Sequence, residues 1–136
     1  MVTIVDYGMG NLHSVLKAFK RLQIPAQISS NPEIIQNASQ LILPGVGNFK
    51  RGMYNLTQRN LIEPLNNAVL NNKVPVLGIC LGMQLMTKHS EEGNVDGLGW
   101  INAKTMGFNF SSMDNSNLHI PHIGWNNVNC ASENPL

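Results

Sequence analysis

Residues 74–86 read VPVLGICLGMQLM, an apolar run that passes through Gly-Ile-Cys-Leu-Gly into residues that favour a helix. Valine and isoleucine favour strands, whereas leucine, methionine and glutamine favour helices. The sequence therefore predicts a strand over 74–79 that turns sharply into a helix at Cys80. Because this strand is apolar throughout, as strands covered on both faces are, we expect it to be the most central strand of a parallel sheet.

Cys80 lies between two glycines at this predicted turn. A strand that enters a helix in one step has a strained backbone, and Gly78 and Gly82 remove the side chains that would clash there. This pattern is that of the nucleophile elbow, with cysteine in place of serine. It places the sulfur above the carboxyl edge of the sheet, at a helix N-terminus that favours the thiolate, and aims the Leu81 N–H at a developing oxyanion. The alternative is an inert cysteine of the core.

The first two thirds of the chain repeat one order: a short β-branched run, a turn with glycine or proline, and a stretch with helical spacing. This order is typical of βα units around a parallel sheet. It predicts strands over 2–6, 26–29 and 40–44, helices that begin near Asn11 and Pro32, and a weaker helix over 61–71. After Gly93, alternating segments predict a small antiparallel section with a long hairpin loop. We expect one α/β domain over 1–136, with a doubly wound, mostly parallel sheet flanked by helices.

Composition limits the functions that this chain can have. Nine Lys plus Arg against eight Asp plus Glu give a net charge of +1, which disfavours a nucleic-acid partner. No apolar run approaches about 18 residues and the N-terminus begins as a strand, so we expect a soluble, cytoplasmic protein with no membrane partner. Cys80 and Cys130 are expected to be thiols. The cysteines and histidines lack ligand spacing, so we expect neither a metal nor a cofactor.

A second glycine-containing loop, LPGVGNF, covers residues 43–49. It follows the end of a predicted parallel strand, where ligands gather in sheets of this kind. Gly45 and Gly47 would let the backbone approach a bound group or flip a peptide plane, so that a backbone N–H completes an oxyanion hole opposite Leu81. An ordinary glycine turn explains the loop equally well.

Six segments occur in a familiar order: VDYGMGNL, LPGVGNF, GICLGMQLM, SEEG, GLGWI and PHIGWN. Together they resemble the class I glutamine amidotransferases, and among these the glutaminase subunits of imidazole glycerol phosphate synthase in histidine biosynthesis. The resemblance covers essentially the whole chain. It implies that Cys80 attacks the amide of glutamine, forms a thioester and releases ammonia. It also implies oxyanion N–H groups from Val46 and Leu81, and glutamine binding by Gly45, Gly47 and Gln84.

The same resemblance implies a protein partner. In this family, ammonia passes to a (β/α)8-barrel cyclase subunit within a heterodimer. Trp125 would then lie at the interface, where tryptophan often contributes strongly to binding, and Asn11 and His122 would lie on the side that faces the partner. The alternatives are a tryptophan packed on its own sheet, a helix cap at Asn11 and a hydrogen-bonded structural role for His122.

The family uses a His-x-Glu pair far downstream of the cysteine as base and orienting carboxylate, and the sequence has no such pair at that place. His89 is followed two positions later by Glu91. However, we expect His89 near the end of the same helix as Cys80, about 13 Å along it, which is too far for a hydrogen bond to the sulfur. The chain is therefore expected to lack the C-terminal part of the domain and to be inactive alone.

Three alternatives remain at this stage. The chain could be a paralogous subunit that supplies ammonia for sugar amidation in surface polysaccharide synthesis. It could be a non-catalytic binding partner of the synthase, as the missing His-x-Glu suggests. A nucleotide-binding domain is the weakest alternative, because Gly8 and Gly10 are not followed by the third glycine of the dinucleotide motif.

Overall fold

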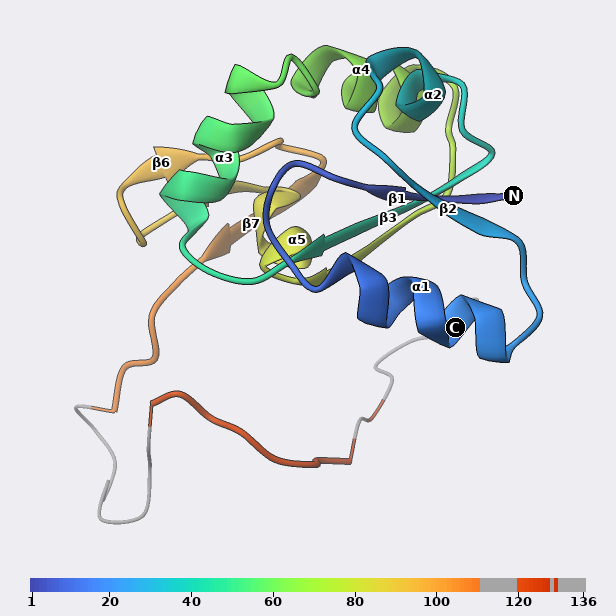
Figure 1. The fold of residues 1–136 in the computed structure, drawn as a ribbon. Helices are drawn as coiled ribbons and strands as arrows, with labels where there is room; N and C mark the ends of the chain where they lie inside the picture. Colours follow the sequence, from blue (N-terminus) through green and yellow to red (C-terminus); the bar gives the residue numbers. More distant parts are fainter. Residues whose placement is uncertain (111–119, 128, 130–136) are drawn as a thin grey trace.

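The computed structural model describes residues 1–110, 120–127 and 129. Its main sheet has four parallel strands in the order β2-β1-β3-β4. The strands are β1 (Val2–Val5), β2 (Ala26–Ser29), β3 (Gln40–Gly45) and β4 (Val76–Cys80). The helices are α1 (Leu12–Arg21), α2 (Pro32–Gln36), α3 (Phe49–Gln58), α4 (Ile62–Asn66), the π-helix η1 (Asn67–Asn71) and α5 (Leu81–Leu85). Helix α1 covers one face of the sheet, and α2, α3 and α4 lie over the other (Figure 1).

Alternating side chains of the strands build two cores. Val2, Ile4 and Ile42 point toward α1, where they pack against its apolar side chains. Val5 and Leu43 point the other way, into a larger core that α2 to α5 complete. Since both faces of β1 and β3 are covered, the side chains of these strands are mostly apolar, as is usual in a parallel sheet.

Asparagine residues begin three of the helices. Asn11 caps α1 by accepting from the Ser14 N–H at 3.2 Å. Asn31 caps α2, with Pro32 in its first turn, and Asn48 caps α3. The predicted helix starts near Asn11 and Pro32 are confirmed, but α3 was not predicted. The signal for it was present in the asparagine cap and in the helical spacing of its buried side chains.

The prediction that β4 is the most central strand is wrong for the described residues, in which it forms one edge of the sheet. Leu77 and Ile79 are 47% and 38% exposed. Leu77 pairs in register with Ile42 and so faces the α1 side, where both residues line an apolar hollow of about 530 Å³. The apolar residues of a strand indicate that its faces are suited to burial. They do not indicate whether the strand lies at the centre or at the edge of the sheet.

A second, smaller sheet follows α5. It contains β5 (Thr87–Ser90), β6 (Val95–Asp96) and β7 (Ile101–Thr105) in the order β6-β5-β7. Strand β6 is antiparallel to β5, but β7 is parallel to it. The predicted antiparallel section is therefore a mixed sheet that begins before Gly93. Most of the predicted hairpin loop lies at 111–119, and this stretch and Cys130 fall outside the described residues.

The expectation that His89 lies on the helix of Cys80 is also wrong, because α5 ends at Leu85 and His89 belongs to β5. Its Nδ1 lies 2.8 Å from an oxygen of Asp96, and its Nε2 lies 3.1 Å from Asn94 Oδ1. The short helix reflects the mixed preferences of residues 86–90, where a β-branched threonine pairs with β7. Among the described residues, none of the helices has the length and apolar character needed to cross a bilayer.

Candidate active site

The predicted sharp turn is present at Cys80, which ends β4 and immediately precedes α5. Its backbone has φ of 53° and ψ of −116°, a conformation that residues with a side chain rarely adopt. The side chain is exposed and unpaired. This geometry holds a free thiol at the carboxyl edge of the sheet and at the start of a helix, as a nucleophile elbow requires.

The glycines on either side of Cys80 are needed because other atoms occupy the space where their side chains would lie. A Cβ at Gly82 would overlap the carbonyl oxygen of Leu43, on the neighbouring strand β3. A Cβ at Gly78 would lie 2.5 Å from the Cα of Met83 and 2.6 Å from the sulfur of Met86. Helix α5 can therefore pack this closely against β4 and β3 only if Gly78 and Gly82 both lack a side chain.

The loop after β3 lies directly against the elbow. Gly45 pairs in register with Cys80, and a Cβ at this position would be 2.9 Å from the Cβ of Leu81. Gly47 has φ of +122°, which favours glycine, and a Cβ there would lie 2.7 Å from Met9 Cε. Val46 lies between them and is 64% exposed. The two predicted glycine-rich segments therefore meet at one edge of the sheet.

An open cavity of about 650 Å³ lies in front of the cysteine. It brings together four of the residues predicted for the site, namely Gly47, Cys80, Leu81 and Gln84. Gly45 is buried behind them. Val46 instead lines a neighbouring hollow of about 590 Å³, which it shares with Asn11 and residues beside it. The loop after β3 thus separates the cavity of Cys80 from the side on which Asn11 lies.

Two carboxylates that the sequence reasoning did not assign to the site also line the cavity. Glu92 accepts from the Phe49 N–H at 2.8 Å and so joins this wall to the start of α3. Glu91 accepts from the Gly107 N–H at 3.0 Å, beside the end of β7. Their signal was the segment SEEG, which contributed to the resemblance without being given a role. Carboxylates at the cavity wall favour a ligand that carries an ammonium group.

Tyr7 is a further residue that the sequence reasoning missed, although it lies within VDYGMGNL. Its hydroxyl is fully buried and makes no hydrogen bond. A Cβ at Gly45 would overlap this hydroxyl, which therefore occupies space beside the elbow. Burial, and to a lesser degree the charge of a Cys80 thiolate, raise the pKa of Tyr7 well above its usual value. The hydroxyl consequently keeps its proton at physiological pH.

The three residues predicted to face a partner lie in different settings. Asn11 caps α1 and also lines the hollow beside Val46. His122 is exposed, and its Nε2 accepts from Asn126 Nδ2 at 2.7 Å. Trp125 is 103% exposed and so does not pack on the sheet of its own chain. The cap at Asn11 and the hydrogen bond of His122 agree with the structural alternatives given for these two residues. The alternative for Trp125, in which it packs on its own sheet, is wrong.

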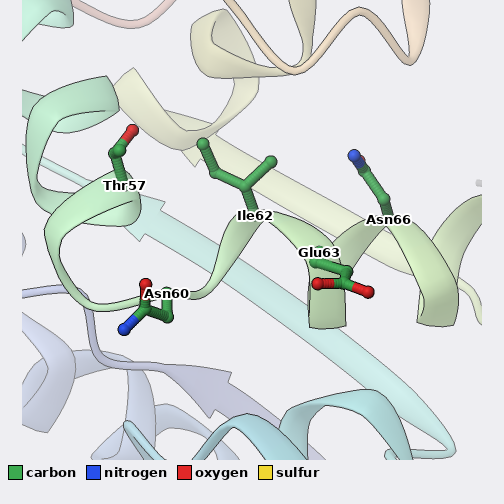
Figure 2. A pocket seen from close by; sticks show the side chains of 5 residues that line it. All are labelled: Thr57, Asn60, Ile62, Glu63 and Asn66. Carbon is green, nitrogen blue, oxygen red and sulfur yellow. The ribbon is translucent and has the colours of Figure 1, made fainter.

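None of the histidines within the described ranges, His13, His89 and His122, lines the cavity of Cys80. In those ranges, no group of three or more His, Cys, Asp or Glu side chains is placed to hold a metal ion. Figure 2 shows a separate hollow between the end of α3 and α4, lined by Thr57, Asn60, Ile62, Glu63 and Asn66. Thr57 donates to the Met53 carbonyl and Asn66 accepts from Trp100, so these polar groups already serve the fold.

The cysteine elbow above a parallel sheet, facing a glycine-rich loop, is the arrangement that the sequence resemblance led us to expect. The family description "Glutamine amidotransferase class-I" matches residues 3–131, so this chain belongs to that family. A solved structure titled "Crystal structure of glutamine amidotransferase" has the same fold, with a TM-score of 0.67 and 21% sequence identity. The match covers 78% of this chain and 56% of that one.

The names of curated relatives are more specific than this family description. The chain is 48% identical over 136 residues to "Imidazole glycerol phosphate synthase subunit HisH 2" of Methanococcus maripaludis, a match that covers all of this chain and 65% of the relative. It is 44% identical over 137 residues to "Imidazole glycerol phosphate synthase subunit HisH 1" of Campylobacter jejuni, covering all of this chain and 66% of the relative. The chain thus spans just under two thirds of the length of these relatives.

Proposed function

We propose that this chain carries the nucleophile of the glutaminase subunit of an imidazole glycerol phosphate synthase, in a single amidotransferase domain in the cytoplasm, although we expect it to be inactive alone. Cys80 carries the proposal, because its strained backbone aims an exposed thiol into a cavity that also contains Gln84 and Gly47. The relatives named for that synthase support the choice of enzyme. A site of this size accommodates an amino acid side chain with its carboxamide next to the sulfur.

In the proposed reaction, the Cys80 thiolate forms a bond to the carboxamide carbon of glutamine. The oxygen of the resulting tetrahedral species takes the negative charge, and the N–H groups of Leu81 and Val46 stabilise it. Collapse breaks the carbon–nitrogen bond, and the leaving nitrogen takes a proton and departs as ammonia. Water then attacks the thioester, which gives glutamate and restores the thiol.

Proton transfer to the leaving nitrogen needs a general acid, and the described histidines lie away from the cavity. We therefore expect the 136-residue chain alone to release no detectable ammonia from glutamine. Alkylation by a glutamine analogue that carries a chloromethyl ketone in place of the carboxamide is different. It forms a sulfur–carbon bond and releases chloride, so it requires the thiolate and the binding site but no proton for a leaving amine.

This analogue provides the test of the proposed function. We expect it to modify Cys80 stoichiometrically, at a rate that excess glutamine lowers at least about tenfold by occupying the site. Asparagine, one methylene shorter, is the matched control ligand and should give little protection. Peptide mass mapping identifies the modified cysteine. If Cys80 remained unmodified, or if glutamine gave no protection, the chain would instead be a non-catalytic member of the family.

We further propose that a (β/α)8-barrel cyclase subunit binds the chain as a heterodimer and receives the ammonia. The exposed side chains of Ile123 and Trp125, at 87% and 103%, are the feature that supports a protein partner here. Large apolar side chains without intramolecular packing are typical of interfaces. Asn11 and His122 are proposed to lie on the same partner-facing side.

Replacing Trp125 with alanine is expected to weaken binding to the cyclase subunit by at least about thirtyfold. A tryptophan that is buried at an interface commonly contributes about 2 kcal/mol or more to the free energy of binding. Isothermal titration of the cyclase with each variant measures the effect. Leu22→Ala removes another exposed apolar side chain, 67% exposed at the end of α1, and serves as the matched control. Equal affinities for both variants would place the interface elsewhere.

A further inference from the structure

Glu92 joins two segments that are distant in sequence and that meet at the cavity of Cys80. Its Oε2 accepts from the Phe49 N–H at 2.8 Å, although the two residues are 43 positions apart. Phe49 is the first residue of α3 and directly follows the loop after β3, residues 46–48. Glu92 and Gly47 of that loop line the same cavity. The carboxylate is therefore bonded to the backbone at the end of a loop that faces the sulfur.

The loop after β3 is fixed at its other end by the main sheet. Gly45 is the last residue of β3 and pairs in register with Cys80. The three residues 46–48 connect this paired strand end to Phe49. Gly47, in the middle, has φ of +122°, and a glycine can exchange such a conformation for others at little cost. The bond at Phe49 therefore limits how far this short segment can move.

The turn that carries Glu92 packs against the start of α3. The Glu92 N–H donates to Ser90 Oγ at 3.1 Å, and Ser90 is fully buried. A Cβ at Gly93 would lie 2.8 Å from the Cβ of Lys50, in the first turn of α3, so the two backbones are in close contact here. The turn thus presents the Glu92 carboxylate to the helix from a defined position.

The bond from Glu92 is additional to the usual cap of this helix. Asn48 already caps α3, because its side chain accepts from the Arg51 N–H at 3.1 Å. The neighbouring carboxylate of Glu91 has a different partner, the Gly107 N–H beyond β7, at 3.0 Å. Glu92 is therefore the member of this acidic pair that acts on the residue next to the loop.

We propose that Glu92 is a positioning residue for the loop after β3, and that its bond to the Phe49 N–H keeps the loop that carries the Val46 N–H beside the cavity. The proposal rests on the proposed function, in which the Val46 N–H stabilises the oxyanion. Binding of a substrate ammonium group would depend on the charge of Glu92. Positioning of the loop depends instead on an acceptor oxygen at the right distance from the backbone.

The test compares Glu92→Gln with Glu92→Asp. Glutamine keeps an oxygen at the same distance from the backbone and loses the charge. Aspartate keeps the charge but is shorter by one methylene, about 1.5 Å, which breaks a bond of 2.8 Å. The probe is a chloromethyl ketone that has the chain length and the carboxylate of the glutamine analogue but lacks its α-amino group. Attraction between an ammonium group and Glu92 therefore does not contribute to the result.

Mass spectrometry of Cys80 at several probe concentrations gives the maximal rate of alkylation. We expect Glu92→Asp to lower this rate at least about fivefold and Glu92→Gln to stay within about twofold of the parent. The ketone oxygen takes the place of the oxyanion while the sulfur–carbon bond forms and chloride leaves, so a displaced loop slows this step. Glu63→Asp, at an exposed residue in the first turn of α4, is the matched control.

Two outcomes of this comparison would overturn the proposal. One is a maximal rate in Glu92→Asp equal to that of the parent. The other is a decrease in Glu92→Gln as large as that in Glu92→Asp, because the charge and not the reach of the side chain would then matter.

Amide hydrogen exchange, followed by NMR, tests the bond without any glutamine analogue. The Phe49 amide should exchange at least about fivefold faster in Glu92→Asp than in the parent, whereas the Ile4 amide in β1 should keep its protection. An unchanged exchange rate at Phe49 would also overturn the proposal. A parent chain that no analogue alkylates would contradict the proposed function, and faster exchange in Glu92→Asp would still support the anchoring of the loop.

Discussion

Replacing Gly82 with alanine is expected to destabilise the chain by more than about 4 kcal/mol, enough to prevent folding of a domain of ordinary stability. The new Cβ would overlap the Leu43 carbonyl oxygen and lie 2.6 Å from its carbonyl carbon. Both atoms belong to the backbone of a central strand, which cannot move away as a flexible side chain could. Relief would require α5 to separate from β3, which would open the main core.

Gly124→Ala is the matched control, because a Cβ at Gly124 meets nothing within 4 Å and the backbone φ there is not positive. Urea unfolding followed by circular dichroism should give nearly the same stability for this variant as for the parent. A Gly82→Ala variant that unfolded at a similar urea concentration would show that α5 can move away from the sheet, and the explanation of the Gly-x-Cys-x-Gly pattern given above would be wrong.

Replacing Cys80 with glycine is expected to abolish modification by the glutamine analogue completely and, at the same time, to stabilise the fold by about 1 kcal/mol. The gain follows because glycine adopts the φ of 53° without the backbone strain of about 1–3 kcal/mol that a residue with a side chain has there. Relief of this strain outweighs the greater conformational freedom of glycine in the unfolded chain. The side chain is exposed, so its removal leaves no cavity. Function and stability should therefore change in opposite directions at this residue.

Cys80→Ala separates the two effects. Alanine also lacks the thiol, so labelling should again disappear, but it keeps a Cβ and with it the backbone strain. Its stability in urea should match that of the parent. If glycine and alanine gave the same stability, the elbow would not be strained, and the conformation of Cys80 would need another cause.

The sequence was sufficient to predict the elbow and the strands that support it. Gly78, Cys80 and Gly82 are specified by local geometry, which depends on residues adjacent in sequence. Strands β1 to β3 were predicted because alternation and turns are also local properties. The resemblance to amidotransferases, which the family match confirms, rested on these same segments.

The errors concern properties that depend on the whole fold. The edge position of β4 depends on which strands pair with it, and its own apolar residues do not encode this. His89 was assigned to a helix because leucine and methionine precede it, but pairing with β7 overrides that preference. Tyr7 was missed because its significance lies in an unpaired atom next to Gly45, and these residues are distant in sequence.

The crowding around Gly45 also affects how this site can evolve. A side chain at this position would meet the Tyr7 hydroxyl, the Leu81 Cβ and the Gly82 nitrogen, which belong to two separate segments of the chain. No single compensating substitution would remove all three clashes. Lineages can therefore reach a larger residue here only after changes elsewhere have accumulated. Among descendants of this protein, Gly45 should vary only together with both position 7 and the first turn of α5, and rarely by itself.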